Sequence, residues 1–87
     1  MNVQDLERIF KDSQVPQRYY SFDGAGGGDC LSLEFIDGSW TISYYSERGT
    51  RRQEGTFTSE DEACYSMFEL INRTMQEEAG RKISLQV

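Results

Sequence analysis

The dipeptide Asp37-Gly38 constrains the fold most, because it lies between two stretches in which apolar and polar residues alternate. A two-residue type I′ turn needs positive φ at both central positions, and Asp-Gly adopts this conformation readily. A turn there pairs Ile36 with Ser39 and fixes the register of the flanking strands, 30–36 and 39–45. The sequence therefore predicts an antiparallel hairpin in the middle of the chain.

The side chains of these two strands agree with that register. Counted outward from the turn, one face carries only apolar pairs: Phe35 with Trp40, Leu33 with Ile42, and Leu31 with Tyr44. The other face pairs Glu34 with Thr41, Ser32 with Ser43, and Cys30 with Tyr45. Because paired residues on one face share an environment, we expect the apolar face to meet helices. The polar face is left to solvent or to a partner.

A polar strand and a long helix are predicted after the hairpin. Residues 51–57 follow a turn at 46–50, and their arginines suit the edge of a sheet. Ser59 and Glu62 have the spacing of a capping box, which predicts the start of a helix. Apolar residues then recur at helical spacing: Cys64, Met67, Phe68, Ile71 and Met75. Gly80 is a typical C-cap and predicts where this helix ends.

The remaining segments complete a single α+β domain over residues 1–87. Residues 2–12 have the apolar spacing of a helix, and 18–22 predict a short further strand. A glycine-rich loop follows at 23–29, and the tail 81–87 fits either an edge strand or an ordered extension. We therefore expect an antiparallel meander sheet of three or four strands. An N-terminal helix and a long C-terminal helix should cover one of its faces.

Charge restricts the partners of this chain. Its 87 residues include 15 acidic and 9 basic side chains, which give a net charge of −6. Nucleic acids and anionic membranes both require a basic surface, so neither is an expected partner. An acidic surface suits a basic protein partner, or serves solubility alone. The N-terminus has no continuous apolar run of the kind found in signal peptides, so we expect a cytoplasmic location.

Catalytic and metal-binding patterns are weak. The chain has no histidine, which removes the commonest general base and the usual activator of a nucleophile. Cys30 and Cys64 match neither a zinc site nor a disulfide framework. The acidic run at 60–62 points in three directions around a helix and suits a helix start. We expect no enzymatic activity, no cofactor and no metal, and a small carboxylate enzyme is the least favoured alternative.

Three short motifs follow one another from the predicted hairpin into the C-terminal half: Trp40-x-x-x-Tyr44, Glu47-Arg48-Gly49, and Phe57-x-Ser59-Glu60-x-Glu62-Ala63-Cys64. In this order they resemble small immunity proteins of bacterial polymorphic toxin systems, including contact-dependent growth inhibition. The resemblance implies a protein that binds the C-terminal toxin domain of its cognate toxin, often a nuclease, and blocks its active site. It implies no catalysed reaction.

The resemblance does not identify contact residues, so these are predicted from their position. We expect partner contacts on the polar sheet face and the adjoining loops, at Asp23, Asp29, Glu34, Thr41, Tyr45 and Glu47. Four of the six are acidic, which would suit the basic cleft of a nuclease. The alternative is a non-enzymatic adaptor or regulatory domain, in which strand 51–57 accepts an added strand from a protein or peptide.

Overall fold

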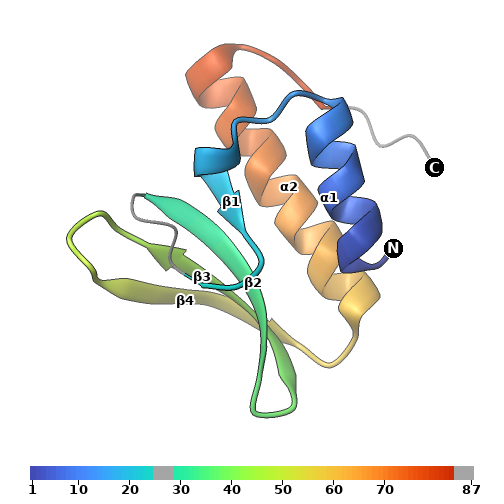
Figure 1. The fold of residues 1–87 in the computed structure, drawn as a ribbon, viewed down its shortest axis with the longest axis vertical. Coiled ribbons are helices and arrows are strands. Elements are labelled where there is room, and N and C mark those ends of the chain that lie inside the picture. Colours follow the sequence, from blue (N-terminus) through green and yellow to red (C-terminus); the bar gives the residue numbers. More distant parts are fainter. Residues whose placement is uncertain (25–28, 84–87) are drawn as a thin grey trace.

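The α+β class predicted from the sequence is confirmed. The computed structural model describes residues 1–24 and 29–83. Within them the elements are α1 (Val3–Asp12), the short 3-10 helix η1 (Gln17–Tyr19), β1 (Tyr20–Ser21), β2 (Cys30–Ile36), β3 (Ser39–Tyr45), β4 (Arg51–Phe57) and α2 (Glu60–Ala79). The strands form one sheet in the order β1-β2-β3-β4. Helix α2 runs along the sheet, and α1 lies beside α2 (Figure 1).

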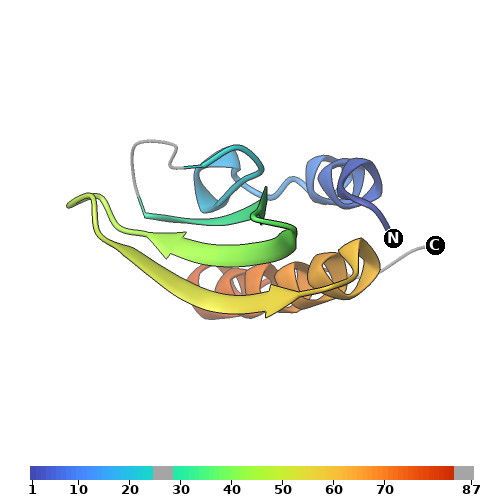
Figure 2. The same ribbon diagram turned by 90° about the horizontal axis from the view of Figure 1, so that it is seen from below.

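The central hairpin has the predicted register. Ile36 is opposite Ser39, and the pairing continues without a shift to Cys30 opposite Tyr45. Asp37 and Gly38 have φ values of 51° and 80°, as a turn with two left-handed residues requires. β4 pairs antiparallel with β3, with a bulge opposite the Ile42–Ser43 step. The strands β2, β3 and β4 therefore form the predicted meander, with β4 at the border of the sheet (Figure 2).

The prediction of a purely antiparallel sheet is wrong at its first strand. β1 pairs parallel with β2, with Tyr20 opposite Leu31 and Ser21 opposite Ser32. Parallel neighbours normally need a long crossover, but β1 is only two residues long, so the stretch from 22 to 29 is enough to return to the start of β2. The short aromatic stretch that predicts this strand carries no information about its direction.

The core forms between α2, α1 and the middle of the sheet. The predicted apolar stripe of α2 is buried, and Cys64, Met67, Ile71 and Met75 have no exposed surface. Leu33 and Ile42 face it from the sheet, and Leu6 and Phe10 from α1. The Phe10 ring lies 4.8 Å from the ring of Tyr20, which joins α1 to β1.

The helix ends follow local capping rules, with one correction. Ser59 accepts a hydrogen bond from the Glu62 amide at 3.3 Å, which is half of the predicted capping box. The reciprocal bond from the Glu62 side chain is not among those of the described residues. A full capping box instead begins α1, between Asn2 and Asp5. Gly80 ends α2 with φ 65° and ψ 20°, as predicted.

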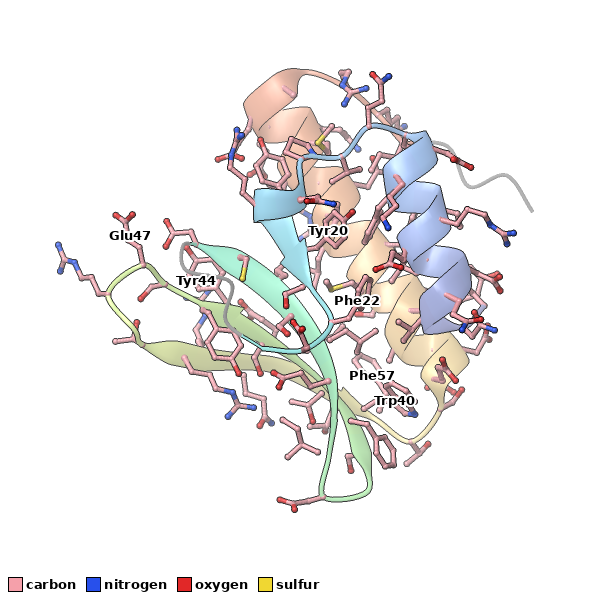
Figure 3. All side chains as sticks on the ribbon, in the orientation of Figure 1. Tyr20, Phe22, Trp40, Tyr44, Glu47 and Phe57 are labelled. Atoms are coloured by element: carbon pink, nitrogen blue, oxygen red, sulfur yellow. The ribbon has the colours of Figure 1, made fainter. Side chains whose placement is uncertain are left out.

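The apolar sheet face is not covered over its whole length, contrary to prediction. Phe35 is 60% exposed, and its ring packs against Trp40 at 5.0 Å. The tip of the β2–β3 hairpin projects beyond the first turn of α2 (Figure 1), so α2 does not cover this end of the face. Figure 3 shows Trp40 near Phe57, its partner across the β3–β4 ladder.

The polar sheet face is less open than predicted. Ser32 and Ser43 have no exposed surface, and Thr41 is 4% exposed. The chain that leaves β1 approaches this face, because the Gly24 amide donates to Ser32 Oγ at 3.2 Å. Burial of this kind is not visible in the alternation of a strand. The tail 84–87 and most of the glycine-rich loop, 25–28, lie outside the described residues.

Candidate functional site

Two of the predicted contact residues meet at one end of the sheet. Asp29 precedes β2, and Glu47 lies in the turn between β3 and β4. The Glu47 amide donates to Asp29 Oδ1 at 2.8 Å, which ties the two loops together. Both side chains are exposed. The sheet therefore ends in a paired set of loops that presents two carboxylates.

Glu34 and Tyr45 form a second contacting pair on the polar face. The Tyr45 hydroxyl donates to Glu34 Oε1 at 2.9 Å, and both side chains are partly buried. This hydrogen bond, followed by burial, raises the pKa of Tyr45 above its ordinary value. Tyr45 therefore remains a protonated donor at neutral pH, and it holds the Glu34 carboxylate in place.

The other two predicted residues lie apart from these pairs. Asp23 is exposed in the segment after β1, and it accepts a hydrogen bond from the Ser21 hydroxyl at 2.9 Å. Thr41 is buried, and its hydroxyl approaches the Ser39 carbonyl at 3.5 Å. Thr41 consequently offers almost no side-chain surface to a partner, whereas Asp23 remains accessible.

A cleft of about 820 Å³ opens between the sheet and the C-terminal half of α2. The β3–β4 turn diverges from this part of α2 (Figure 1), and Tyr44 and Glu47 lie on the sheet side of the opening (Figure 3). Leu31 and Leu70 contribute apolar surface from opposite walls. The lining also includes the side chains of Arg18, Tyr19, Asp29, Tyr44, Glu47, Arg52, Glu54, Arg73, Glu77 and Glu78.

Two of the cleft arginines are held by neighbours. Arg52 donates to Glu54 Oε1 at 2.8 Å, and its guanidinium lies 5.3 Å from the centre of the Tyr44 ring. Arg18 lies 5.0 Å from the centre of the Tyr19 ring. Such stacking on aromatic faces is favourable for a guanidinium group. These contacts fix aromatic and cationic groups along the walls and engage part of the positive charge.

The carboxylates at the rim of the cleft are not engaged in this way. Asp29, Glu47, Glu77 and Glu78 are exposed, and none of them belongs to an ion pair within the described part of the chain. They come from the loop before β2, the β3–β4 turn and the last turn of α2. The fold thus gathers carboxylates around one opening, where they outnumber the arginines of the lining.

The helical half of this site was not predicted from the sequence, and it includes Leu70, Arg73, Glu77 and Glu78. One signal for it exists in the sequence, because two acids close the predicted helix where basic residues are favoured. The cleft itself depends on the angle between α2 and the sheet. Tertiary packing sets this angle, and no local pattern encodes it.

The cysteines do not form a reactive site in the described structure. Cys30 and Cys64 are buried, and both thiols are free. Burial raises the pKa of Cys64 to about 11, so this thiol is protonated at neutral pH and is a poor nucleophile. Among residues 1–24 and 29–83, no three Cys, Asp or Glu side chains converge in a way that could hold a metal ion.

Comparison with known proteins adds no family assignment. The chain matches no protein-family model, and neither the curated proteins nor the solved structures gave a match. None of the described helices is both long and apolar enough to cross a bilayer. Functional inference therefore rests on the residues and their arrangement.

Proposed function

We propose that this protein is a non-enzymatic immunity protein that binds a cognate bacterial toxin domain and covers its active site. The observation that carries the proposal is the rim of exposed carboxylates around the cleft, Asp29, Glu47, Glu77 and Glu78, which form no ion pair within residues 1–24 and 29–83. Charge of one sign gathered at a concave surface attracts a partner of the opposite sign and speeds their association. The expected partner is a basic protein surface.

The choice of a toxin domain comes from the sequence. The motif order between Trp40 and Cys64 resembles small bacterial immunity proteins, and it includes the turn that presents Glu47. A toxin that acts on nucleic acid has a basic cleft for phosphates, and a rim of carboxylates is complementary to such a cleft. Nuclease inhibition by occlusion is therefore the most specific form of the proposal.

Growth rescue tests this function directly. The product of the neighbouring gene is expressed in cells with and without this protein, and the two proteins are purified together through a tag on one of them. The proposal predicts that the neighbouring product arrests growth alone, that co-expression restores growth, and that the two proteins co-purify. A neighbouring product that is harmless, or that does not bind, contradicts it.

A matched pair of charge reversals locates the interaction. Glu47→Lys places a positive charge on the rim, whereas Glu69→Lys makes the same change on an exposed part of α2 that does not line the cleft. We expect Glu47→Lys to weaken binding at least about tenfold, which corresponds to about 1.4 kcal/mol. Glu69→Lys should rescue growth like the wild type. Equal loss with both variants would indicate a general charge effect and exclude the rim as the contact surface.

A second candidate function is a peptide-binding adaptor that uses β4. This strand lies at the border of the sheet, and the side chains from Arg51 to Glu54 are exposed. An extended peptide could pair with such an edge through main-chain hydrogen bonds. The bulge in β4 and its charged side chains work against that pairing, since both features protect edge strands. If this function is correct, partner binding would change the NMR chemical shifts of the amides in Arg51–Phe57 and leave those of α2 unchanged.

A further inference from the structure

The residues that line the cleft suit a long side chain with a charged end. Its volume of about 820 Å³ lies within the range of ligand-binding pockets. Leu31 and Leu70 supply partly buried apolar surface, and the rings of Tyr19 and Tyr44 stand among the lining residues. Lysine and arginine lay their methylene groups along apolar surface while the charged end stays near polar groups. The cleft offers both environments.

The charge of the lining residues determines which charge the bound group should carry. Five carboxylates and three guanidinium groups line the cleft, and Arg52 is already paired with Glu54. Four carboxylates then remain against Arg18 and Arg73, so the opening keeps an excess of negative charge. Phosphate groups would be repelled, and a second copy of this acidic chain, with a net charge of −6, is a poor match.

The C-terminal end of α2 is a second place where carboxylates lack a cationic partner within the described residues. Glu77 and Glu78 occupy the last turn of the helix, and this turn contains no basic residue. The C-terminus of a helix carries partial negative charge, so two carboxylates there are electrostatically unfavourable. They form no ion pair that would offset this within the described residues. A cation placed in the cleft would relieve the repulsion.

From this geometry we infer that the cleft between the sheet and α2 is the site that receives a lysine or arginine side chain of the partner protein. The inference rests on the proposed function for the identity of the partner, but the chemistry of the site is testable without it. The partner residue packs its alkyl part against Leu31 and Leu70. Its charged end lies among the rim carboxylates Asp29, Glu47, Glu77 and Glu78.

A peptide titration tests the site by itself. The probe is the capped peptide acetyl-Gly-Arg-Arg-Gly-amide, added to the ¹⁵N-labelled full chain at low salt, with acetyl-Gly-Glu-Glu-Gly-amide as the reverse-charge control. We expect changes in the NMR chemical shifts of the amides of Leu31, Tyr44 and residues 70–78 with the arginine peptide only. Shifts spread evenly over the acidic surface would overturn the inference. So would tighter binding of spermidine, which would assign the cleft to a small polyamine.

Two double variants separate the cleft from general acidity. Glu77→Gln/Glu78→Gln and Glu62→Gln/Glu69→Gln each remove two carboxylates from α2, but only the first pair lines the cleft. We expect the first variant to weaken arginine-peptide binding at least about threefold and the second to leave it within about 1.5-fold, because neither Glu62 nor Glu69 lines the cleft. This comparison is made in about 0.1 M salt, where the Debye length is about 10 Å and more distant charges are largely screened. Equal weakening by both variants overturns the inference.

The two proposals fail in distinguishable ways. If the toxin domain binds the wild type and Glu77→Gln/Glu78→Gln equally well, the cleft is not the receiving site, while toxin neutralisation stands. If the arginine peptide occupies the cleft but the neighbouring gene product neither binds nor arrests growth, the partner is a different basic protein. The immunity function is then wrong, while the cleft stands as a site for a basic side chain.

Discussion

Tyr45 and Glu34 show how one hydrogen bond arranges a predicted contact surface. They come from neighbouring strands, and the Tyr45 hydroxyl donates to Glu34 Oε1 at 2.9 Å while both side chains are partly buried. The interaction fixes the position of the carboxylate, and it keeps the phenol protonated by raising the pKa of Tyr45. These two residues are therefore part of the fold as well as candidates for partner contact.

Removing this hydroxyl should cost stability. Tyr45→Phe leaves the partly buried Glu34 without its donor, and we expect the free energy of unfolding to fall by about 1 kcal/mol at pH 7. Tyr65→Phe is the matched control, because Tyr65 is 40% exposed and its hydroxyl has no hydrogen bond within the described structure. Urea denaturation of both variants measures the difference. Equal stability of Tyr45→Phe and wild type would contradict the structural role.

The pH dependence of this effect has a definite sign. A raised pKa in the folded state means that the contribution of Tyr45 is complete below the ordinary tyrosine pKa of about 10. It is lost as pH rises through the folded value. The stability gap between wild type and Tyr45→Phe should therefore narrow at strongly alkaline pH, and a constant gap would assign the effect to packing alone.

At the scale of elements, the two carboxylates in the last turn of α2 destabilise the helix, so the fold does not require them. Glu77→Gln/Glu78→Gln should raise the free energy of unfolding by about 0.6–2 kcal/mol, since each of the two carboxylates near the helix C-terminus costs about 0.3–1 kcal/mol. The same variant should bind the partner less tightly. Denaturation and partner titration of one preparation measure both quantities. A variant that is less stable than the wild type would contradict this account of the helix end.

Local patterns predicted the elements that depend on local rules. The Asp37-Gly38 turn fixes the β2–β3 register, the spacing of Cys64, Met67 and Ile71 gives the buried face of α2, and Gly80 gives its end. These features depend on the conformational preferences of a few residues and on a repeat of side chains. They are therefore visible without any knowledge of the tertiary structure.

Features that depend on packing between distant segments were not predicted. The direction of β1 is set by where the chain after α1 meets β2, and a two-residue strand carries no pattern for it. Thr41 alternates like an exposed residue but is buried, on the face where Gly24 reaches Ser32. Phe35 has the position of a core residue in the alternating pattern, but it is exposed because it lies beyond the first turn of α2. The cleft also depends on packing between distant segments, so its residues on α2 were not predicted from the sequence.

At the scale of the whole molecule, the structure is a thin α+β domain, 16 Å along its shortest axis, with its candidate site at one end. Three separate stretches of the chain bring exposed carboxylates to the same opening, and the described ion pairs lie elsewhere apart from Arg52–Glu54. This arrangement favours association with a basic surface. The proposal of an immunity protein adds the identity of that surface, a toxin domain whose active site is covered.

Calorimetric titration of this protein with the catalytically inactivated toxin domain of the neighbouring gene product tests the central claim most directly. The account predicts a 1:1 complex with a dissociation constant below about 1 μM, or about −8.2 kcal/mol. It also predicts that binding weakens as ionic strength rises from about 0.05 M to about 0.5 M, because salt screens the charges. Absence of binding, or an affinity that does not change with salt, would contradict it.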